Sequence, residues 1–454
     1  HVIGLVGYRE DDTNNFGRAN ESEVGFDDAD VDGRWNPDFT RLSSTPGLSQ
    51  KANSVTWSVV ARFPEKIVGE LPWGMDLQAH YAESENFNPI GLRSNALGKS
   101  IGQPTGTTQE YGFTTSFADN RVSIKLNWFE TSLQNLSASG AFEIANDSLA
   151  SISLYREADL AGKPWAENLA LVNGSPESFP IQDYNSYYQL AQSDIPSELL
   201  AIYNPRQEDT DGDGVWDTLD WDTVPNLSAT RDLKAEGFEV EMVASLSKGW
   251  RVMANLSQQE SVNANTASVM LEAAGEFLAN SRSSRTFEVI QQRLVADRTM
   301  GDTWFRDRFV PLVAQTTLDG TKSQEQREWR FSGVTNYEFL EGRLKGLEFG
   351  GAVRWEDEAA TGYVTTFDPN AEVAIPIADT SRPFLDDGLF SGDLWAGYGR
   401  KIANGKMDWR VQLNIRNAFG DNSDIPVRTN PDGQVAVIRI PNPRTISIAN
   451  TIKF

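Results

Sequence analysis

The sequence contains no cysteine, only two histidines and no long apolar run. Without cysteine the chain forms no disulfide and no thiolate metal site, and it has no thiol nucleophile. The two histidines, His1 and His80, are too few for a histidine metal site. His80 falls on the polar side of its predicted strand, which favours a lining residue over a metal ligand. No run of about 18 apolar residues occurs, and this excludes a transmembrane helix.

Basic residues are also scarce. Forty Lys and Arg stand against 64 Asp and Glu, which gives a net charge of −24 and a pI near 4.5. Such a surface repels nucleic acid and anionic lipid head groups, so we expect neither as a partner. The G-x-S-x-G, phosphate-loop and H-E-x-x-H motifs are missing. Charged residues on polar strand faces, such as Glu239, Glu241, Lys125 and Arg410, are explained as residues that face water. The sequence therefore predicts no enzyme.

Instead, apolar and polar residues alternate with a period of two. In M-D-W-R-V-Q-L-N-I-R-N, Met407–Asn417, the residues Trp409, Val411, Leu413 and Ile415 share one face. This pattern is typical of a strand with one apolar and one wet face. It recurs along the chain and predicts twelve strands. They are Val2–Tyr8, Ser54–Phe63, Gly74–Glu83, Thr107–Phe117, Val122–Leu133, Ala235–Ser247, Trp250–Gln259, Glu325–Phe339, Leu344–Trp355, Leu389–Ile402, Lys406–Arg416 and a last strand that ends at Phe454.

The connections between these strands are alternately short and long. Membrane barrels sort their loops in this way, with short periplasmic turns and long extracellular loops. Aromatic residues mark both strand ends, as expected of two girdles at lipid head-group level. Those at the short-turn end are Phe63, Trp73, Phe117, Trp250, Phe339, Trp409 and Phe454, and those near the long-loop end are Trp128, Trp329 and Trp355. The sequence predicts an all-β, antiparallel up-and-down transmembrane β-barrel. The alternative is a soluble all-β protein whose alternating faces pack in a core.

The longest connection, residues 134–234, shows no strand pattern and is predicted to be a long extracellular loop. Aromatic and amide side chains in the loops are candidates for ligand contact, but packing of a loop against itself explains them better, so the ligand-binding residues stay unassigned. They include Asn15, Asn86, Trp165, Tyr184, Tyr187 and Tyr188. Between Val262 and Ser323, the spacing of Met270, Leu271, Ala274 and Phe277 predicts a helix inside a loop rather than a separate domain.

An acidic motif lies near the end of the longest loop. In D-T-D-G-D-G-V-W-D-T-L-D, Asp209–Asp220, five carboxylates occupy positions 1, 3, 5, 9 and 12 of a calcium loop. The predicted Ca²⁺ ligands are Asp209, Asp211, Asp213, Asp217, Asp220 and the carbonyl of Val215, with Gly214 at the sharp turn. An EF-hand has a bidentate Glu where Asp220 stands, so Asp222 is a substitute ligand. The flanks do not indicate helices, which favours a calcium loop outside an EF-hand. The alternative is a solvated acidic loop.

The C-terminal stretch resembles a known family. N-A-F-G-D at Asn417–Asp421, P-R-T at Pro443–Thr445 and the final Phe454 are similar to the end of TonB-dependent outer-membrane receptors. The resemblance is strongest over Trp329–Phe454. It implies that the barrel-assembly machinery reads Phe454. It also implies a barrel of about twenty-two strands around an N-terminal plug. Residues 1–454, which open at His1 without a signal peptide, are then expected to be a partial barrel, a fragment of such a receptor.

By this resemblance the protein lies in the outer membrane of a Gram-negative-type bacterium, surrounded by outer-membrane lipid. It would take up a scarce, large nutrient with energy from the TonB complex, which an N-terminal segment absent from this sequence would contact. The ligand would be a small molecule or a glycan, and the sequence does not choose among a ferric siderophore, a cobalamin and a glycan. A passive porin-like channel and a soluble calcium-dependent β-rich binding protein are the alternatives.

Overall fold

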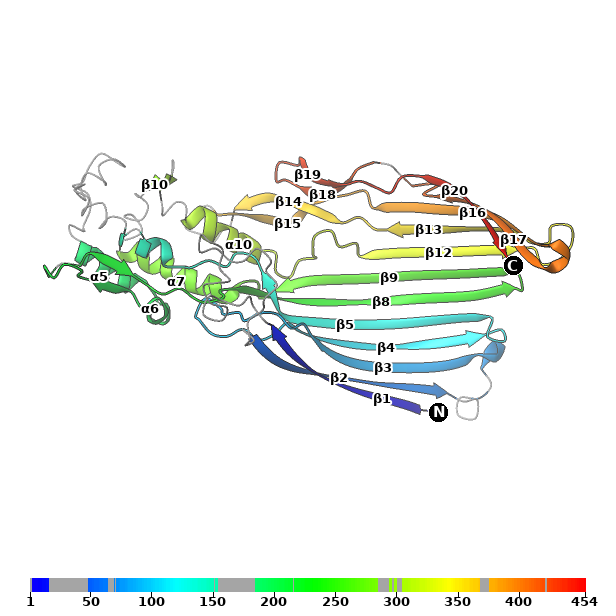
Figure 1. Ribbon diagram of the computed structural model, residues 1–454, viewed down its shortest axis with the longest axis horizontal. Coiled ribbons are helices and arrows are strands. Elements are labelled where there is room, and N and C mark those ends of the chain that lie inside the picture. The colour runs from blue at the N-terminus through cyan, green and yellow to red at the C-terminus, as the bar shows by residue number, and fades with distance from the viewer. Residues whose placement is uncertain are drawn as a thin grey trace, which may run out of the picture.

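Twelve strands form one antiparallel sheet in the computed structural model (Figure 1). The structure describes residues 2–15, 48–63, 69, 71–150, 152–153, 184–214, 216–284, 294–295, 298–299, 304–367, 375–420 and 423–454. The strands of the sheet, in spatial order, are β1 (Val2–Asn15), β2 (Leu48–Phe63), β3 (Asp76–Phe87), β4 (Thr105–Phe117), β5 (Val122–Ala138), β8 (Ala229–Ser247), β9 (Trp250–Ala264), β12 (Trp329–Glu338), β13 (Leu347–Glu356), β16 (Leu389–Ile402), β17 (Met407–Arg416) and β20 (Thr445–Lys453).

All twelve predicted strands are present, and each pairs with the sheet strand before and after it in the chain. This up-and-down order confirms the predicted fold class. The sheet ends at β1 and β20, so in the described part of the chain it is open. Several strands run farther than predicted because their polar ends also pair: in β1 and β2, Asp12 lies opposite Lys51 and binds its ammonium group. The predicted loop 134–234 is correspondingly shorter, since β5 ends at Ala138 and β8 begins at Ala229.

Short and long connections lie at opposite ends of the sheet, as predicted. Both chain termini lie at the short-turn end (Figure 1). The predicted turn between β4 and β5 consists of three left-handed residues, Ala118, Asp119 and Asn120, with φ of 55°, 57° and 61°. Short 3₁₀ segments, η2 (Pro72–Gly74) and η5 (Ala403–Gly405), make two other turns.

The two faces of the sheet differ in chemistry. On one face large apolar side chains are exposed, among them Phe113 at 46%, Phe349 at 48% and Ile448 at 73%. On the other face polar side chains bind each other across strands. His80 Nε2 lies 2.8 Å from Asn127 Oδ1, and Arg410 binds Glu348. A water-soluble sheet buries its apolar face, so this arrangement is inverted for a protein in water.

Aromatic residues form a continuous row across the apolar face. Tyr81, Tyr111, Trp128 and Phe238 are directly opposite one another on consecutive strands, and Gln258 connects them to Trp329. The rings of Tyr111 and Trp128 stack at 5.9 Å. At the short-turn end a second group includes Trp250 and Tyr337, whose ring centroids are 6.5 Å apart. The two predicted aromatic belts are therefore on one face of the sheet.

The long connections fold into further elements. These are the helices α5 (Tyr184–Asp194), α6 (Ser197–Tyr203), α7 (Ser268–Ser284) and α10 (Val310–Thr316), the π-helix η4 (Phe305–Phe309), and the two-stranded pairs β6 (Arg206–Glu208) with β7 (Thr218–Asp220), β10 (Leu294–Val295) with β11 (Arg298–Thr299), β14 (Ala360–Phe367) with β15 (Pro376–Leu385), and β18 (Ile425–Thr429) with β19 (Val435–Arg439). Helix α7 confirms the helix predicted inside the 262–323 loop.

No helix within the described residues is long and apolar enough to cross a membrane.

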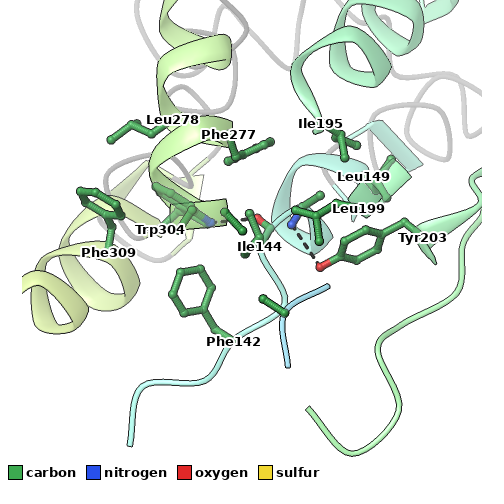
Figure 2. Packing of buried hydrophobic residues seen from close by; sticks show 14 of the residues in the cluster. Phe142, Ile144, Leu149, Ile195, Leu199, Tyr203, Phe277, Leu278, Trp304 and Phe309 are labelled. Carbon is green, nitrogen blue, oxygen red and sulfur yellow. Dashed lines mark hydrogen bonds between the residues drawn. The ribbon is translucent and has the colours of Figure 1, made fainter. Parts of the chain in front are cut away.

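The hydrophobic core lies in these loops, not in the sheet. We call the loop cap the packed parts of the β3–β4, β5–β8 and β9–β12 connections together with Ile375 and Ile377. Figure 2 shows Ile144 at its centre, with Phe142, Trp304 and Phe309 on one side and Tyr203 on the other. Among the described residues, seven of the eight largest fully buried side chains belong to it. They are Ile144, Leu149, Ile152, Leu199, Tyr203, Met270 and Leu312.

The N-A-F-G stretch, which carries the family resemblance, is a strained turn that fixes the end of β17. Asn417 has φ of 51°, and its amide group rests on Gly420, where a Cβ would lie 1.6 Å from Asn417 Oδ1. The Asn417 backbone N–H donates to Asp393, and its side-chain amide donates to the Asn442 carbonyl at 2.8 Å. Any side chain at position 420 would therefore disturb the link between β17 and the segment that leads into β20. Asp421 lies outside the described residues.

Candidate functional site

The acidic motif forms the tip of the β6–β7 hairpin. Arg206 pairs with Asp220, Gln207 with Leu219 and Glu208 with Thr218, so the intervening nine residues, 209–217, are one closed loop. Strands rather than helices flank it directly, as expected for a calcium loop outside an EF-hand. The loop turns at Gly212 and Gly214, whose φ values of 77° and 86° are left-handed and suit glycine.

Three carboxylates converge at this tip. One oxygen each from Asp209, Asp211 and Asp217 lies within 4.8 Å of the other two. The backbone N–H groups of Gly212 and Gly214 donate to Asp209 at 2.7 and 2.8 Å. The hydrogen bond from Gly214 lowers the pKa of Asp209, and those from Gly212 and Asp213 act in the same direction. Asp209 is therefore an ionised, acceptor-only group at neutral pH, as a hard cation requires.

The other predicted ligands are placed differently. Asp213 is in the same loop but outside the converging trio, and Val215 lies outside the described residues. Asp220 and the substitute ligand Asp222 both turn to Arg206, whose guanidinium binds them at 2.7 and 3.0 Å. Sequence reasoning missed this competitor because Arg206 precedes the acidic run. A predicted hairpin with Arg206 opposite Asp220 would have revealed this competing cation.

The hairpin is anchored in the loop cap. Trp216, next to Asp217, is buried, and its indole N–H donates to Asn185 of α5 at 2.7 Å. Leu219 is buried in the same core. The Asp222 backbone N–H donates to the Tyr203 carbonyl at 2.7 Å. The position of the three carboxylates is therefore set by core residues on both sides of the loop.

Tyr203 makes a buried hydrogen-bond network beside the hairpin. Its hydroxyl donates to Glu143 at 2.7 Å and accepts from the Ala145 backbone N–H. Burial and the Glu143 carboxylate raise the pKa of Tyr203 far above its ordinary value. The other oxygen of Glu143 accepts from the Val224 N–H at 2.9 Å. This tyrosine is a structural hydrogen-bond donor, not an acid or base.

The aromatic and amide candidates for ligand contact have local partners where the structure describes them. Tyr188 is buried, and its hydroxyl donates to the Pro205 carbonyl at 3.0 Å, in agreement with packing of the loop against itself. Asn86 accepts from the Phe87 backbone N–H. Trp165 and the side chains of Asn15, Tyr184 and Tyr187 lie outside the described residues, as does His1.

A cavity of about 930 Å³ lies at the long-loop ends of β13, β16 and β17. Its lining is charged and includes Arg354, Arg416 and Asp393, and Arg354 donates to Asp393 at 3.0 Å. The segment around β18 and β19 contributes Asp424 and Arg439. Sequence reasoning missed this site because its residues come from several distant connections.

We call the residues around this cavity the rim, and a buried ion pair closes one side of it. Arg327 binds Asp386 with both terminal guanidinium nitrogens and also donates to the Asp357 carbonyl. Asp386 in turn accepts from the backbone N–H groups of Ala359 and Gly388 at 3.0 and 3.1 Å. The pair thus joins the connections that precede β12, follow β13 and precede β16.

No protein-family model and no curated protein matches the chain. Comparison with solved structures finds the FpvA receptor of Pseudomonas aeruginosa bound to a heterologous pyoverdine, at 13% identity and a TM-score of 0.38, covering 99% of this chain and 45% of that one. It also finds the ferric-catecholate import receptor Fiu from Escherichia coli K12, at 13% identity and a TM-score of 0.41, covering 100% and 42%. A third match is the siderophore receptor PiuA from Acinetobacter baumannii, at 13% identity and a TM-score of 0.40, covering 91% and 38%. The chain thus spans less than half the length of these receptors.

Proposed function

We propose that the twelve-stranded sheet is part of the wall of a TonB-dependent receptor in the outer membrane of a Gram-negative-type bacterium. The exposed apolar face, opposite a hydrogen-bonded polar face, carries this proposal. Phe113, Phe349 and Leu413 lie on the face opposite the polar one and are 39–48% exposed. Contact of such a surface with lipid carries no free-energy cost, whereas its contact with water is unfavourable.

The dimensions of the apolar band support a bilayer. On β12, Trp329 in the upper aromatic row and Tyr337 in the lower group are eight residues apart. At about 3.4 Å per residue this spans about 27 Å, close to the height of about 25 Å of an outer-membrane apolar band. Above the row, β5 and β8 continue with polar residues toward the loop cap. In this orientation the loop cap is extracellular and Phe454 is periplasmic, where the barrel-assembly machinery would read it.

The proposed cargo is a scarce, large nutrient, a ferric siderophore, a cobalamin or a glycan, and its import would be energised through TonB. The polar rim cavity is large enough for such a ligand, because ligand pockets measure about 300–1,000 Å³. FpvA is described as bound to pyoverdines, Fiu as a ferric-catecholate import receptor and PiuA as a siderophore receptor, and we place a ferric siderophore first among the candidates.

Uptake assays in a deletion strain of the source bacterium test this function. The strain is complemented with the full gene, starved of iron, and supplied with radiolabelled ferric siderophores, cobalamin or an oligosaccharide. We expect uptake of one of these to require the gene and to stop when a protonophore dissipates the proton-motive force. Gene-dependent uptake that survives the protonophore would instead identify a passive channel, and a protein that purifies from the aqueous fraction without detergent would overturn the membrane assignment.

We further propose that the β6–β7 hairpin binds Ca²⁺ through Asp209, Asp211 and Asp217. Hard Ca²⁺ takes six to eight oxygen ligands, so carbonyl groups of the loop and water would complete the shell. The cation would offset repulsion among carboxylates held within 4.8 Å. We expect an affinity typical of extracellular modules, on the order of 10⁻⁴–10⁻³ M.

Calorimetry on the purified full chain tests the calcium proposal. Asp217→Asn should abolish calcium-dependent heat, whereas Asp119→Asn, an exposed carboxylate in the turn at the other end of the sheet, should leave it unchanged. Asp213→Ala and Asp220→Asn decide whether these two residues join the trio. The absence of heat at millimolar Ca²⁺ in the unmodified chain would leave only a solvated acidic loop.

A further inference from the structure

The connections at the long-loop end of the sheet share one hydrophobic core. Four connections that are far apart in the chain contribute to it: Ala96 from β3–β4, Phe142 and Leu149 from β5–β8, Leu312 from β9–β12, and Ile375 from β13–β16. Leu149 and Leu312 are fully buried. Ala96, Leu312 and Ile375 are thus buried in one cluster with residues of other connections.

Hydrogen bonds tie the same connections together. The Trp304 indole N–H donates to the Ile144 carbonyl at 3.0 Å inside the core (Figure 2). Asn280 of α7 donates to the Asp194 carbonyl at the end of α5, at 3.1 Å. A buried polar group that loses its partner is destabilised, so separating α7 from α5 breaks polar as well as apolar contacts.

The β3–β4 connection is joined to the base of the loop cap by its backbone. The Ser94 N–H donates to the Asn226 carbonyl at 3.0 Å, and the Ser228 N–H donates to the Ser94 carbonyl at 2.8 Å. Ser94 also forms a parallel bridge with Leu227. These bonds extend the cap beyond the two longest loops and place a third connection in the same body.

Left-handed residues lie where the chain passes from the sheet into the cap. Asn135 has φ of 57° beside a register shift in the β5–β8 pair, and Asn226, Asn265 and Ala267 have φ of 55°, 54° and 51°. Asp232 binds left-handed residues from two connections at this boundary: it accepts from the Asn135 N–H at 3.1 Å and from the Asn265 side-chain amide at 2.8 Å. The β5–β8 ladder is interrupted at Asn135 and continues only as far as the Ala138–Ala229 pair, and backbone at the ends of strands is where a change of direction is absorbed.

From the shared core, the cross-loop bonds and this boundary, we propose that the loop cap is a single lid. Its four connections open and close together about the line of left-handed residues, as one cooperative unit distinct from the sheet. Independent surface loops would instead each open with their own equilibrium. A lid of this kind uncovers the long-loop end of the sheet in one step, so its opening equilibrium is set by buried residues of the shared core.

Native-state hydrogen exchange on the full chain in detergent micelles tests the lid. Leu149→Ala and Leu312→Ala remove fully buried side chains from two different connections. Each should accelerate exchange about 30-fold or more, and in the same four segments, 93–98, 142–149, 267–278 and 375–377. Leu344→Ala, in the short connection before β13 and 51% exposed, is the matched control and should leave these segments unchanged.

Acceleration confined to residues 142–149 in the first variant and to residues near Leu312 in the second would overturn the proposal. A second measurement keeps the test open if a variant does not fold. In the unmodified chain, rising urea should bring the protected amides of the four segments onto one common opening curve. Separate curves for the four connections would show independent loops.

Discussion

The buried pair Arg327–Asp386 provides the sharpest test of the rim. The two side chains are only 7% and 3% exposed. Replacing Arg327 with methionine keeps most of the side-chain volume but leaves the Asp386 carboxylate buried without its cation. Breaking a buried pair from one side costs about 3–5 kcal/mol. Since about 1.36 kcal/mol is a factor of ten, exchange of the Ala359 and Gly388 amides, which donate to Asp386, should rise about 10²–10⁴-fold.

A second substitution separates the stranded charge from lost packing. Asp386→Leu in the Arg327→Met background removes the uncompensated carboxylate, and with it the acceptor of the Ala359 and Gly388 amides, so recovery is read at the Asp357 backbone N–H, which donates to the Trp329 carbonyl at 2.9 Å. Most of the protection should return there because apolar replacement of a whole buried pair is often neutral. Arg439→Met is the control: it breaks the exposed pair with Glu325, whose side chains are 58% and 46% exposed. Exposed pairs contribute about 0–1 kcal/mol. Equal effects of Arg327→Met and Arg439→Met on the rim amides would refute the reasoning.

Three further predictions concern the membrane wall and the rim. Leu413→Arg, on the apolar face of β17, should destabilise the folded chain in lipid vesicles by about 2–4 kcal/mol if residue 413 lies near mid-bilayer. Gln412→Arg, on the polar face, should have a mild effect. Equal unfolding midpoints of the two variants in urea would contradict the assignment of faces. Deleting Phe454 should lower surface levels in cells more than refolding yield in detergent, because it would act during assembly, and unchanged surface labelling would exclude that role. Burial by itself raises the pKa of Asp386, but the hydrogen bonds from Arg327 and two backbone N–H groups hold that pKa below its ordinary value. Stability from a lowered carboxyl pKa is present above the unfolded value of about 3.9 and is lost as pH falls through the folded value. Exchange at the rim, divided by the intrinsic exchange rate at each pH, should therefore be steady from pH 7 to about 5 and increase below about 4, and Asp386→Asn should remove this increase.

The wall of the sheet could be predicted from sequence because each strand separates two different surroundings. Trp409, Val411 and Leu413 alternate with Arg410 and Gln412, and this period of two survives without any knowledge of the partner strand. Strand ends were less well predicted. Beyond the upper aromatic row the outer face becomes polar, with Glu130 of β5 opposite Glu236 of β8, whereas Leu133 and Leu233 lie on the other face. The ends of β1, β5 and β8 therefore do not continue the alternation and were assigned to loops.

The loop cap could not be predicted in the same way because its burial is non-local. Helix α7 was found, since Met270, Ala274 and Phe277 repeat on one helical face. Helix α6 and the π-helix η4 are short, and the burial of Tyr203 and Phe309 depends on contacts with other connections. The family resemblance names the receptor class but says nothing of these contacts.

The acidic loop was partly predictable. The spacing of Asp209, Asp211 and Asp217 brought the three carboxylates together, because a tight loop with glycine at its turns sets their positions locally. Asp220 belongs to a strand instead, and the hairpin places it opposite Arg206. The acidic run from Glu208 to Asp222 contains no basic residue. The run by itself therefore could not show this pairing.

The location of the hydrophobic core has a consequence for how the molecule denatures. The loop cap excludes water with its own side chains, while the exposed apolar face of the sheet depends on lipid or detergent for its shielding. Urea acts on the first directly, whereas the second is governed by the amphiphile. The loop cap is therefore stabilised against water and the sheet against lipid or detergent, and a single free energy of unfolding does not describe the chain. A thermal or urea scan should give two transitions, of which only the one from the sheet shifts when the detergent is changed.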